Sequence, residues 1–373
     1  MLRNKEKGFS LVDLILLVLI ICAIVVVCFM LTSDKSLSEI SQVNTIIDLV
    51  TSNTTNNKPN KEIVSNVTLA NDILEQNFSS SQSYNNQQQN LQALNYFFYN
   101  QLNENEKGMY NRIINNIQAF KSGSDEIEIA TSKENVNLKF QSCWDAFCLD
   151  RPDIFYIDTK KVSFLTQTTS SMWDGVKVKY ILKPQGNGSY YLSCWSSESE
   201  IDSAMNEIEA VANEVIDKST NYPSMYDKVK YIHDFIIENA EYNQNKGIND
   251  ADIYGNLVKK TSVCEGYAKA FKYLLDKLNI PCIIVCGNGI ADDGHSEFHA
   301  WNYVQMDDAN WYAVDTTWDD PIVIGNGKLS EKSKHKYFLV GSNNFSDTHQ
   351  EDGDVSGTGQ NFIYPKLSAT NYN

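Results

Sequence analysis

Three residues in the C-terminal half of the chain have side chains that could together carry out nucleophilic chemistry: Cys264, His299 and Asp315. A cysteine thiolate can attack the carbonyl carbon of an amide, and an imidazolium can protonate the amine that leaves. A carboxylate bonded to the imidazole holds it in the useful tautomer and stabilises its positive charge. The three side chains therefore supply the roles that acyl transfer through a thioester requires.

The cysteine stands where a helix is expected to begin. In TSVCEGYAKAFKYLL (261–275) apolar residues recur at three- and four-residue steps, and the pattern stops at 279–281, which ends in proline. Free backbone N–H groups and the positive end of a helix dipole favour a thiolate at this position. The spacing predicts that Cys264 is an activated thiol at a helix N-terminus.

The other two residues fall on segments that predict a β-hairpin. HAWNYVQM (299–306) and WYAVDTTW (311–318) are separated by a turn at 307–310. His299 and Asp315 share one face of this hairpin only if opposed residue numbers have an even sum, which requires an odd-length loop or one β-bulge. Taken singly, a buried core cysteine and a satisfied strand histidine are the commoner interpretations. The joint placement of all three groups favours catalysis.

A metal site is the rival interpretation of the same region. Cys282, Cys286, His295 and His299 superficially resemble a zinc-finger ligand series. The central gap is short, however, and GNGIADDG (287–294) is expected to be a loop after the buried strand CIIVC, so it cannot supply the finger helix. We therefore predict no metal ligands, and no calcium or other cofactor motif is visible.

Two amphipathic helices are expected before the cysteine, over 198–218 and 226–243. His233 lies in the second. Because a lone helical histidine is more often packed or exposed than a ligand, we interpret it as structural.

A smaller α+β region is expected between about Leu91 and 197. Asn103 and Glu106 have the spacing of a capping box, and two antiparallel helices are predicted over 93–120. Alternating segments then predict a small antiparallel sheet: EIEIA, KVSFLTQ, VKVKYIL and SYYLSCW. Asp150-Arg151-Pro152-Asp153 is interpreted as a turn rather than a loop facing a substrate.

The N-terminal segment carries a strong membrane signal. Residues 14–31 are eighteen consecutive apolar positions, close to the length of a transmembrane helix. Arg3, Lys5 and Lys7 precede this run, so the positive-inside rule places the N-terminus in the cytoplasm. We expect a single-pass protein of the cell membrane whose catalytic domain is extracytoplasmic.

KGFSLVDLILLVLI (7–20) also resembles the leader of type IV pilins and pseudopilins. The resemblance implies cleavage after Gly8, methylation of the new N-terminal residue Phe9, and an acid at the fifth mature position that helps pilin-like subunits assemble. That acid is usually glutamate and is Asp13 here. Simple anchoring, with Asp13 at the membrane interface, is the alternative.

Composition sets the remaining bounds. A formal net charge of −16 and a pI near 4.7 argue against nucleic acid as the main partner. The eight cysteines are too few for a disulfide-scaffolded mini-protein, and their pairing cannot be deduced. The polar run Ser79–Asn90 has nothing to bury and is interpreted as a tether. The expected organisation is a leader (1–8), a transmembrane helix (9–31), a stalk and linker (32–90), an α+β domain (91–197) and a catalytic domain (198–373).

SVCEGYAKAF, HAWNYV and WYAVDTTWDDP closely resemble the core of the transglutaminase-like superfamily, in its bacterial extracytoplasmic branch. The similarity spans roughly 217–349. It implies that Cys264 is the nucleophile, His299 the general acid and base, and Asp315 the orienting residue. It also implies a papain-like α+β core, with the cysteine helix packed on an antiparallel sheet. By the same resemblance, the Cys264 backbone N–H and a donor near Tyr254 would hold the oxyanion.

The sequence thus predicts a membrane-tethered thiol enzyme that acts on amides of proteins or peptidoglycan peptides. Hydrolysis and transamidation share the acyl-enzyme and differ in whether water or an amine resolves it, and the sequence leaves both open. A second hypothesis is a catalytically inactive surface or pilus-associated protein that keeps the fold for binding, because a fold alone does not prove activity.

Overall fold

A computed structural model of the protein describes residues 96–121, 127–132, 140–171, 175–184, 194–291, 293–320, 330–357 and 361–373. All of them belong to one unit of the chain, Val67–Asn373. The expected leader with Gly8, Phe9 and Asp13, the transmembrane helix, and the stalk and linker lie outside the described residues. None of the helices in the described part combines the length and apolar character that a membrane span requires.

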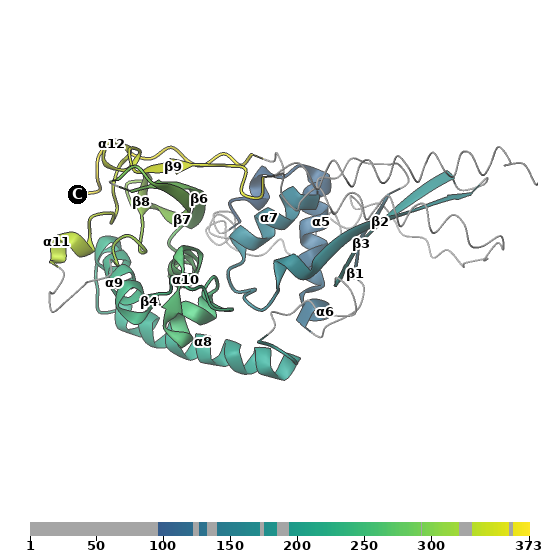
Figure 1. The fold of residues 1–373 in the computed structure, drawn as a ribbon, viewed down its shortest axis with the longest axis horizontal. Helices are drawn as coiled ribbons and strands as arrows, with labels where there is room; N and C mark the ends of the chain where they lie inside the picture. The colour runs from purple at the N-terminus through teal and green to yellow at the C-terminus, as the bar shows by residue number, and fades with distance from the viewer. Residues whose placement is uncertain are drawn as a thin grey trace, which may run out of the picture. The chain divides into compact units, whose positions relative to one another are not determined.

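The described chain has the mixed α+β architecture that the sequence predicts (Figure 1). Helix α10 packs on strands β6 and β7 of a four-stranded antiparallel sheet of order β8-β7-β6-β9, and helices α8 and α9 also contact α10. The cysteine-bearing helix therefore packs on an antiparallel sheet, as expected. These elements are α8 (Glu198–Ser219), α9 (Met225–Asn239), α10 (Cys264–Lys277), β6 (Cys282–Ile290), β7 (Ser296–Gln305), β8 (Trp311–Val314) and β9 (His349–Glu351).

Helix α10 begins at Cys264, which confirms the predicted start. Its apolar side, which includes the fully buried Tyr267, Phe271 and Leu274, faces the core. Burying one such side chain contributes about 1.5–3 kcal/mol. The helix ends because Asn279 adopts a left-handed backbone (φ 54°), a common way to terminate a helix.

Strand β6 is longer than the sequence predicts. It continues through Gly287 and Gly289 to Ile290, so the expectation of a loop after Cys286 is wrong for these residues. Glycine usually weakens a strand, which is why the GNG sequence predicts a loop. Here a Cβ at Gly287 would lie 2.1 Å from the backbone oxygen of Gln350 on the neighbouring strand. The close approach of β9 therefore requires the glycine.

The smaller region contains a three-stranded antiparallel sheet of order β1-β3-β2, and helices α5 and α7. The three strands confirm EIEIA, KVSFLTQ and VKVKYIL, whereas most of SYYLSCW lies outside the described residues. Their bounds are β1 (Ile127–Ser132), β2 (Val162–Ser171), β3 (Gly175–Pro184), α5 (Glu104–Asn115) and α7 (Phe140–Asp150).

The partner of α5 differs from the prediction. Within the described part of 93–102 there is only a short 3-10 helix, η2 (Tyr99–Gln101), and α5 packs against α7 instead. The sequence does not predict α7, because eight of its eleven residues are buried and the apolar and polar positions show little helical periodicity.

Short elements complete the described chain. They are α6 (Ile117–Lys121), η3 (Thr159–Lys161), β4 (Glu241–Tyr242), the π-helix η4 (Gly255–Lys259), β5 (Thr261–Ser262), α11 (Glu331–Lys334) and α12 (Ser342–Phe345).

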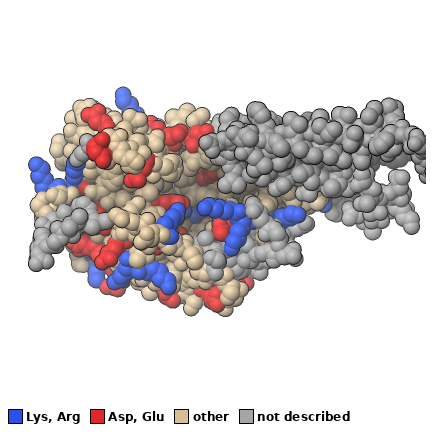
Figure 2. Space-filling view, in the orientation of Figure 1, with Lys and Arg blue, Asp and Glu red and all other residues tan. Residues whose placement is uncertain are grey.

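The surface carries charges of both signs. On the face drawn in Figure 2, acidic and basic side chains are interspersed. Exposed pairs such as Lys218 with Glu214, at 2.6 Å, occur one helical turn apart. Such pairs contribute little to stability, so the charges that shape this protein are the buried ones described below.

The capping box at the start of α5 yields a stability prediction. The Asn103 side chain accepts the Glu106 N–H at 3.0 Å, and the Glu106 carboxylate accepts the Asn103 N–H at 3.0 Å. We expect Asn103→Ala to lower the free energy of unfolding by about 1 kcal/mol, because an orphan helix N–H loses its acceptor. Urea denaturation measures the change. Asn103→Ser keeps a capping oxygen and is expected to stay close to wild type; equal losses in both variants would contradict the cap.

Candidate active site

Cys264 is the first residue of α10, and its side chain is only partly buried. The preceding Val263 is extended, and its N–H donates to the Asp250 carbonyl at 2.9 Å. Gly266 permits this contact, because a Cβ there would lie 2.2 Å from the Asp250 carbonyl oxygen. The backbone of the cysteine is thus fixed at a helix N-terminus, where the first N–H groups have no partner within the helix.

The register of β7 and β8 brings His299 and Asp315 together. Opposed residues, from Asn302 with Val314 to the last pair before the turn, all have even sums, and the connection 306–310 is five residues long. The condition that opposed residue numbers have an even sum, with a loop of odd length, is therefore confirmed. His299 Nε2 lies 2.8 Å from Asp315 Oδ2.

The Asp315 carboxylate is fully buried and accepts four hydrogen bonds. Its Oδ2 contacts the Nε2 atoms of His299 at 2.8 Å and His349 at 2.9 Å. Its Oδ1 accepts the backbone N–H groups of Thr317 at 2.9 Å and Trp318 at 3.1 Å. Burial alone would raise the pKa of Asp315, but the charge of His299 and these hydrogen bonds hold the pKa well below its usual range. The carboxylate is therefore ionised.

His299 is also buried, at 2 % exposure. Burial alone would lower the pKa of its imidazole, but the charge and hydrogen bond of Asp315, followed by interactions with Cys264, raise the pKa to about 10. Since Nε2 contacts Asp315, Nδ1 is the ring nitrogen left for an interaction with Cys264. The three side chains thus lie in series, with a proton donor next to the thiol.

Trp318 covers the imidazole of His299. The two rings are stacked with centroids 5.4 Å apart. Gly289 on β6 makes room for both, because a Cβ there would lie 2.9 Å from Trp318 Cζ2 and 3.3 Å from His299 Cβ. The tryptophan limits the access of water to the His299–Asp315 pair and so strengthens the interaction between their charges.

Sequence reasoning did not assign a role to His349, although the structure places it against Asp315. The residue comes from β9, whose Gly289↔His349 pairing with β6 joins distant parts of the chain. No local pattern predicts this pairing; the resemblance, which extends to about 349, includes the residue without giving it a role.

Tyr254 has hydrogen-bond partners of its own. Its hydroxyl donates to Glu207 at 3.1 Å and its backbone N–H donates to Asp252 at 2.8 Å. Its ring packs on Phe155 and Trp195. Both donors of Tyr254 are therefore engaged with other acceptors. The backbone N–H of Cys264, at the first position of the helix, remains the candidate oxyanion donor.

A second histidine cluster fixes the turn that follows Asp315. The fully buried His233 lies between two carboxylates, with Nδ1 3.1 Å from Asp234 Oδ1 and Nε2 3.1 Å from Asp319 Oδ2. His335 Nε2 contacts the same Asp234 oxygen at 2.6 Å. Lys230 also pairs with Asp234, so the negative charges of this cluster already have cationic partners. Its position gives it an anchoring role for the Asp315–Asp319 turn.

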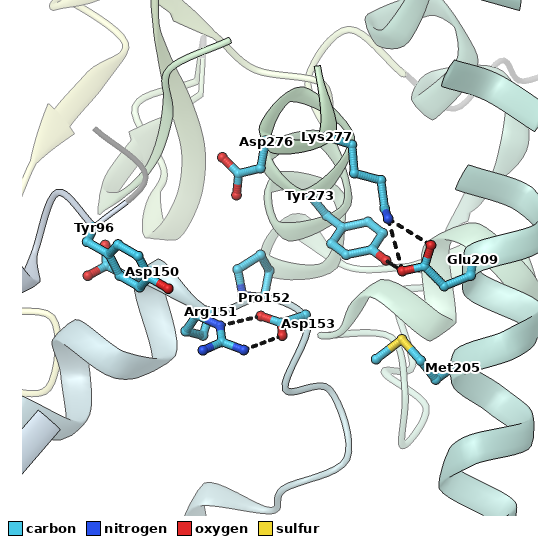
Figure 3. A pocket seen from close by; sticks show the side chains of 10 residues that line it. All are labelled: Tyr96, Asp150, Arg151, Pro152, Asp153, Met205, Glu209, Tyr273, Asp276 and Lys277. Atoms are coloured by element: carbon cyan, nitrogen blue, oxygen red, sulfur yellow. Dashed lines mark hydrogen bonds and ion pairs between the residues drawn. The ribbon is translucent and has the colours of Figure 1, made fainter. Parts of the chain in front are cut away.

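The Asp150–Asp153 segment lines a pocket of about 370 Å³ beside the C-terminal end of α10 (Figure 3). Four of its charged residues form two pairs: Arg151 makes two hydrogen bonds to Asp153, and Lys277 makes two to Glu209. Cys264 is at the opposite end of α10. The pocket is therefore separate from the candidate active site.

The charge of Asp315 can be tested through the titration of His299. In Asp315→Asn we expect the pKa of His299 to fall from about 10 towards the ordinary value of 6.5, because the carboxylate is the main group that raises it. His299 would then lose its proton at lower pH than in wild type. NMR of ¹⁵N-labelled histidine follows the titration. Asp308→Asn, a matched change in the exposed turn after β7, is the control; an equal shift in both variants would refute the assignment.

The three site residues lie within a segment that matches a family model. Residues 209–316 match the family described as the transglutaminase-like superfamily. No curated protein matches the sequence. Among solved structures, a TGase is similar at 17% identity and TM-score 0.29, over 48% of this chain and 50% of that one. The chain therefore spans about half the length of that protein.

Two further structures are similar. A putative cysteine protease from Cytophaga hutchinsonii has 14% identity and TM-score 0.26, over 43% of this chain and 68% of that one. The periplasmic domain of TgpA from Pseudomonas aeruginosa, bound to ethylmercury, has 15% identity and TM-score 0.24, over 43% and 66%. The assignment rests on the matched segment: residues 209–316, which carry Cys264, His299 and Asp315, form a domain of the transglutaminase-like superfamily.

Proposed function

We propose that the protein is a thiol enzyme that transfers or hydrolyses acyl groups at amides of proteins or peptidoglycan peptides. The observation that carries the proposal is the series of Cys264, His299 and the ionised Asp315, with His299 hydrogen-bonded to Asp315 and interacting with Cys264. A buried carboxylate with four donors supports the imidazolium next to a thiol at a helix N-terminus. This is the arrangement that nucleophilic acyl transfer requires.

The first half of the reaction follows from the proton positions. The Cys264 sulfur attacks the amide carbonyl carbon, a C–S bond forms, and the carbonyl oxygen takes the negative charge. The backbone N–H of Cys264 is placed to stabilise that oxyanion. His299 then gives its Nδ1 proton to the amide nitrogen, the C–N bond breaks, and a free amine leaves. The product is a thioester on Cys264 with a neutral His299.

The second half regenerates the enzyme. Water or a primary amine attacks the thioester carbonyl and gives a proton to Nδ1 of His299. The C–S bond breaks, and sulfur leaves as the thiolate beside the restored imidazolium. Water yields a carboxylic acid, whereas an amine yields a new amide. Both outcomes use the same three residues of this chain.

The proposed location is the outer side of the cell membrane. It is supported by the apolar run 14–31 and by the basic residues before it. Processing after Gly8, with Phe9 as the new N-terminus and Asp13 available to pilin-like subunits, is the more specific form of this proposal. An enzyme tethered there meets proteins and peptides of the cell surface.

Selective alkylation tests the thiol chemistry. We expect iodoacetamide to label Cys264 of the full-length protein at neutral pH faster than the other free cysteines, because a neighbouring imidazolium and a helix N-terminus favour the reactive form of a thiol. In His299→Ala the Cys264 labelling rate is expected to fall by about tenfold. Mass spectrometry of the labelled peptides measures each site, with Cys148→Ala as a control that leaves Cys264 unchanged. If Cys264 reacts like an ordinary thiol in wild type, a binding role for the fold is favoured instead.

A paired assay separates the two reaction outcomes. We expect wild type, incubated with a glutamine-containing protein and a fluorescent primary amine, either to attach the amine or to release ammonia or peptides without attaching it. Both products depend on the thioester, so Cys264→Ala is expected to give neither. A protein whose thiol is activated but which yields neither product from proteins is to be tested next on peptidoglycan peptides.

The N-terminus is tested by intact-mass analysis of protein from its native host. We expect a chain that begins at a methylated Phe9, because the leader resembles that of pilins. Replacement of Gly8 by alanine is expected to block the cleavage. A mature wild-type chain that still carries Met1 to Gly8 would leave only simple anchoring.

A further inference from the structure

A second imidazole contacts the carboxylate of the proposed active site. His349 Nε2 lies 2.9 Å from Asp315 Oδ2, the same oxygen that His299 Nε2 contacts at 2.8 Å. Acyl transfer by cysteine, histidine and aspartate needs only one imidazole. The second one therefore requires its own explanation.

The surroundings of His349 fix its ring closely. The side chain is fully buried, and the ring stacks on Phe345 with centroids 3.9 Å apart and an interplanar angle of 11°. Trp318 packs on it at 4.5 Å. Its Nδ1 lies 2.9 Å from the Thr348 hydroxyl oxygen. Both ring nitrogens thus have partners, so the imidazole is held in one orientation.

The hydrogen bonds indicate which proton His349 carries. Burial and the positive charge of His299 lower its pKa, although Asp315 acts in the opposite direction, so the ring is neutral. Since Asp315 is ionised and can only accept, the single ring proton is on Nε2 and is donated to Oδ2. Nδ1 then accepts from the Thr348 hydroxyl at 2.9 Å, a shorter contact than the 3.2 Å from that hydroxyl to the Phe345 carbonyl. His349 is a donor that has no charge of its own.

We propose that His349 is a positioning residue of this site: its Nε2–H fixes Asp315 Oδ2 in the plane where His299 needs it and takes up part of the charge of that oxygen. The inference rests on the function proposed above. His349 contacts Asp315 and acts through it on His299.

The hydrogen bond from His349 to Asp315 affects how strongly Asp315 holds the proton of His299. With both donors present, the Asp315 oxygen is divided between two N–H groups, and its attraction for the His299 proton is moderated. Without His349, the oxygen would interact with His299 alone, the His299 proton would be held more tightly, and the imidazolium would be a weaker acid towards the leaving amine. The carboxylate would also lose the partner that opposes its rotation.

Other titratable groups lie near Asp315 and His299, and a test of His349 must leave them unchanged. They are Cys264 of α10, Tyr242 of β4, Asp319 of the turn after β8, and Tyr337, whose ring centroid lies 5.3 Å from that of His349. Substitutions confined to position 349 leave all of them in place.

The experiment compares His349→Phe with His349→Gln in the full-length protein. Phenylalanine keeps the stacking on Phe345 but removes the donor, whereas glutamine retains an amide N–H donor. Two quantities are measured: the alkylation rate of Cys264 by iodoacetamide, and the NMR position of the His299 Nε2 proton bonded to Asp315, with ¹⁵N-labelled histidine. Neither depends on knowing the substrate.

In His349→Phe we expect the His299 Nε2 proton to move downfield, because its hydrogen bond to Asp315 becomes stronger. The alkylation rate of Cys264 at neutral pH is expected to stay above that of His299→Ala, because a more tightly held imidazolium still favours the reactive form of a neighbouring thiol. His349→Gln is expected to return the proton resonance towards its wild-type position. A merely structural histidine would not move the proton resonance and would not be rescued by glutamine. A folded His349→Phe whose His299 Nε2 proton stays at the wild-type position, or whose Cys264 reacts as slowly as in His299→Ala, would overturn the proposal.

A measurement on wild type covers the case in which His349→Phe does not fold. The ¹⁵N shifts of His349 at neutral pH are expected to be those of a neutral ring protonated on Nε2. A charged ring, or a proton on Nδ1, would overturn the proposal without any variant. Failure of the proposed function is distinguishable: Cys264 alkylation would then be the same in wild type and His299→Ala, whatever the state of His349.

Discussion

The buried negative charge of Asp315 is the constraint on which the rest of the site depends. An isolated carboxylate in a protein interior is so costly that it normally takes up a proton. Here its oxygens receive four hydrogen bonds, two from backbone N–H groups of the following turn and two from imidazoles. The carboxylate therefore stays ionised, and its charge keeps His299 protonated beside the thiol of Cys264.

Strand β6 determines how the two imidazoles reach this charge. Gly287 pairs with His299 of β7, and Gly289 pairs with His349 of β9, so glycines of one strand lie beside both histidines. A side chain at either glycine would meet the backbone of β9 or the ring of Trp318. Glycine has a low strand propensity, but at these two positions only a residue without a side chain leaves space for β9 and the ring of Trp318. The strand still forms because both of its edges are hydrogen-bonded.

Local patterns predicted the elements that carry Cys264 and His299, and an arithmetic condition on the hairpin predicted that His299 and Asp315 could meet. The predicted strand 311–318 is too long, because β8 ends at Val314 and Asp315 begins the following turn. These features depend on helical periodicity and on strand alternation, which act over a few residues. The β9 pairing that brings in His349 is long-range and leaves no local trace. Helix α7 was missed for a related reason, because a helix buried on most sides has no polar face to reveal its period.

The histidines show why apolar patterns alone cannot describe this site. The chain has five histidines, and four of them belong to two clusters with aspartates: His299–Asp315–His349 and His233–Asp234–His335. One turn joins the clusters, because Asp319, which is bonded to His233, donates its N–H to the Asp315 carbonyl at 3.1 Å. Loss of a partner in either cluster would leave a buried carboxylate poorly compensated. The hydrophobic core thus places the strands and helices, whereas this polar network sets the orientation of the one carboxylate that the proposed chemistry requires.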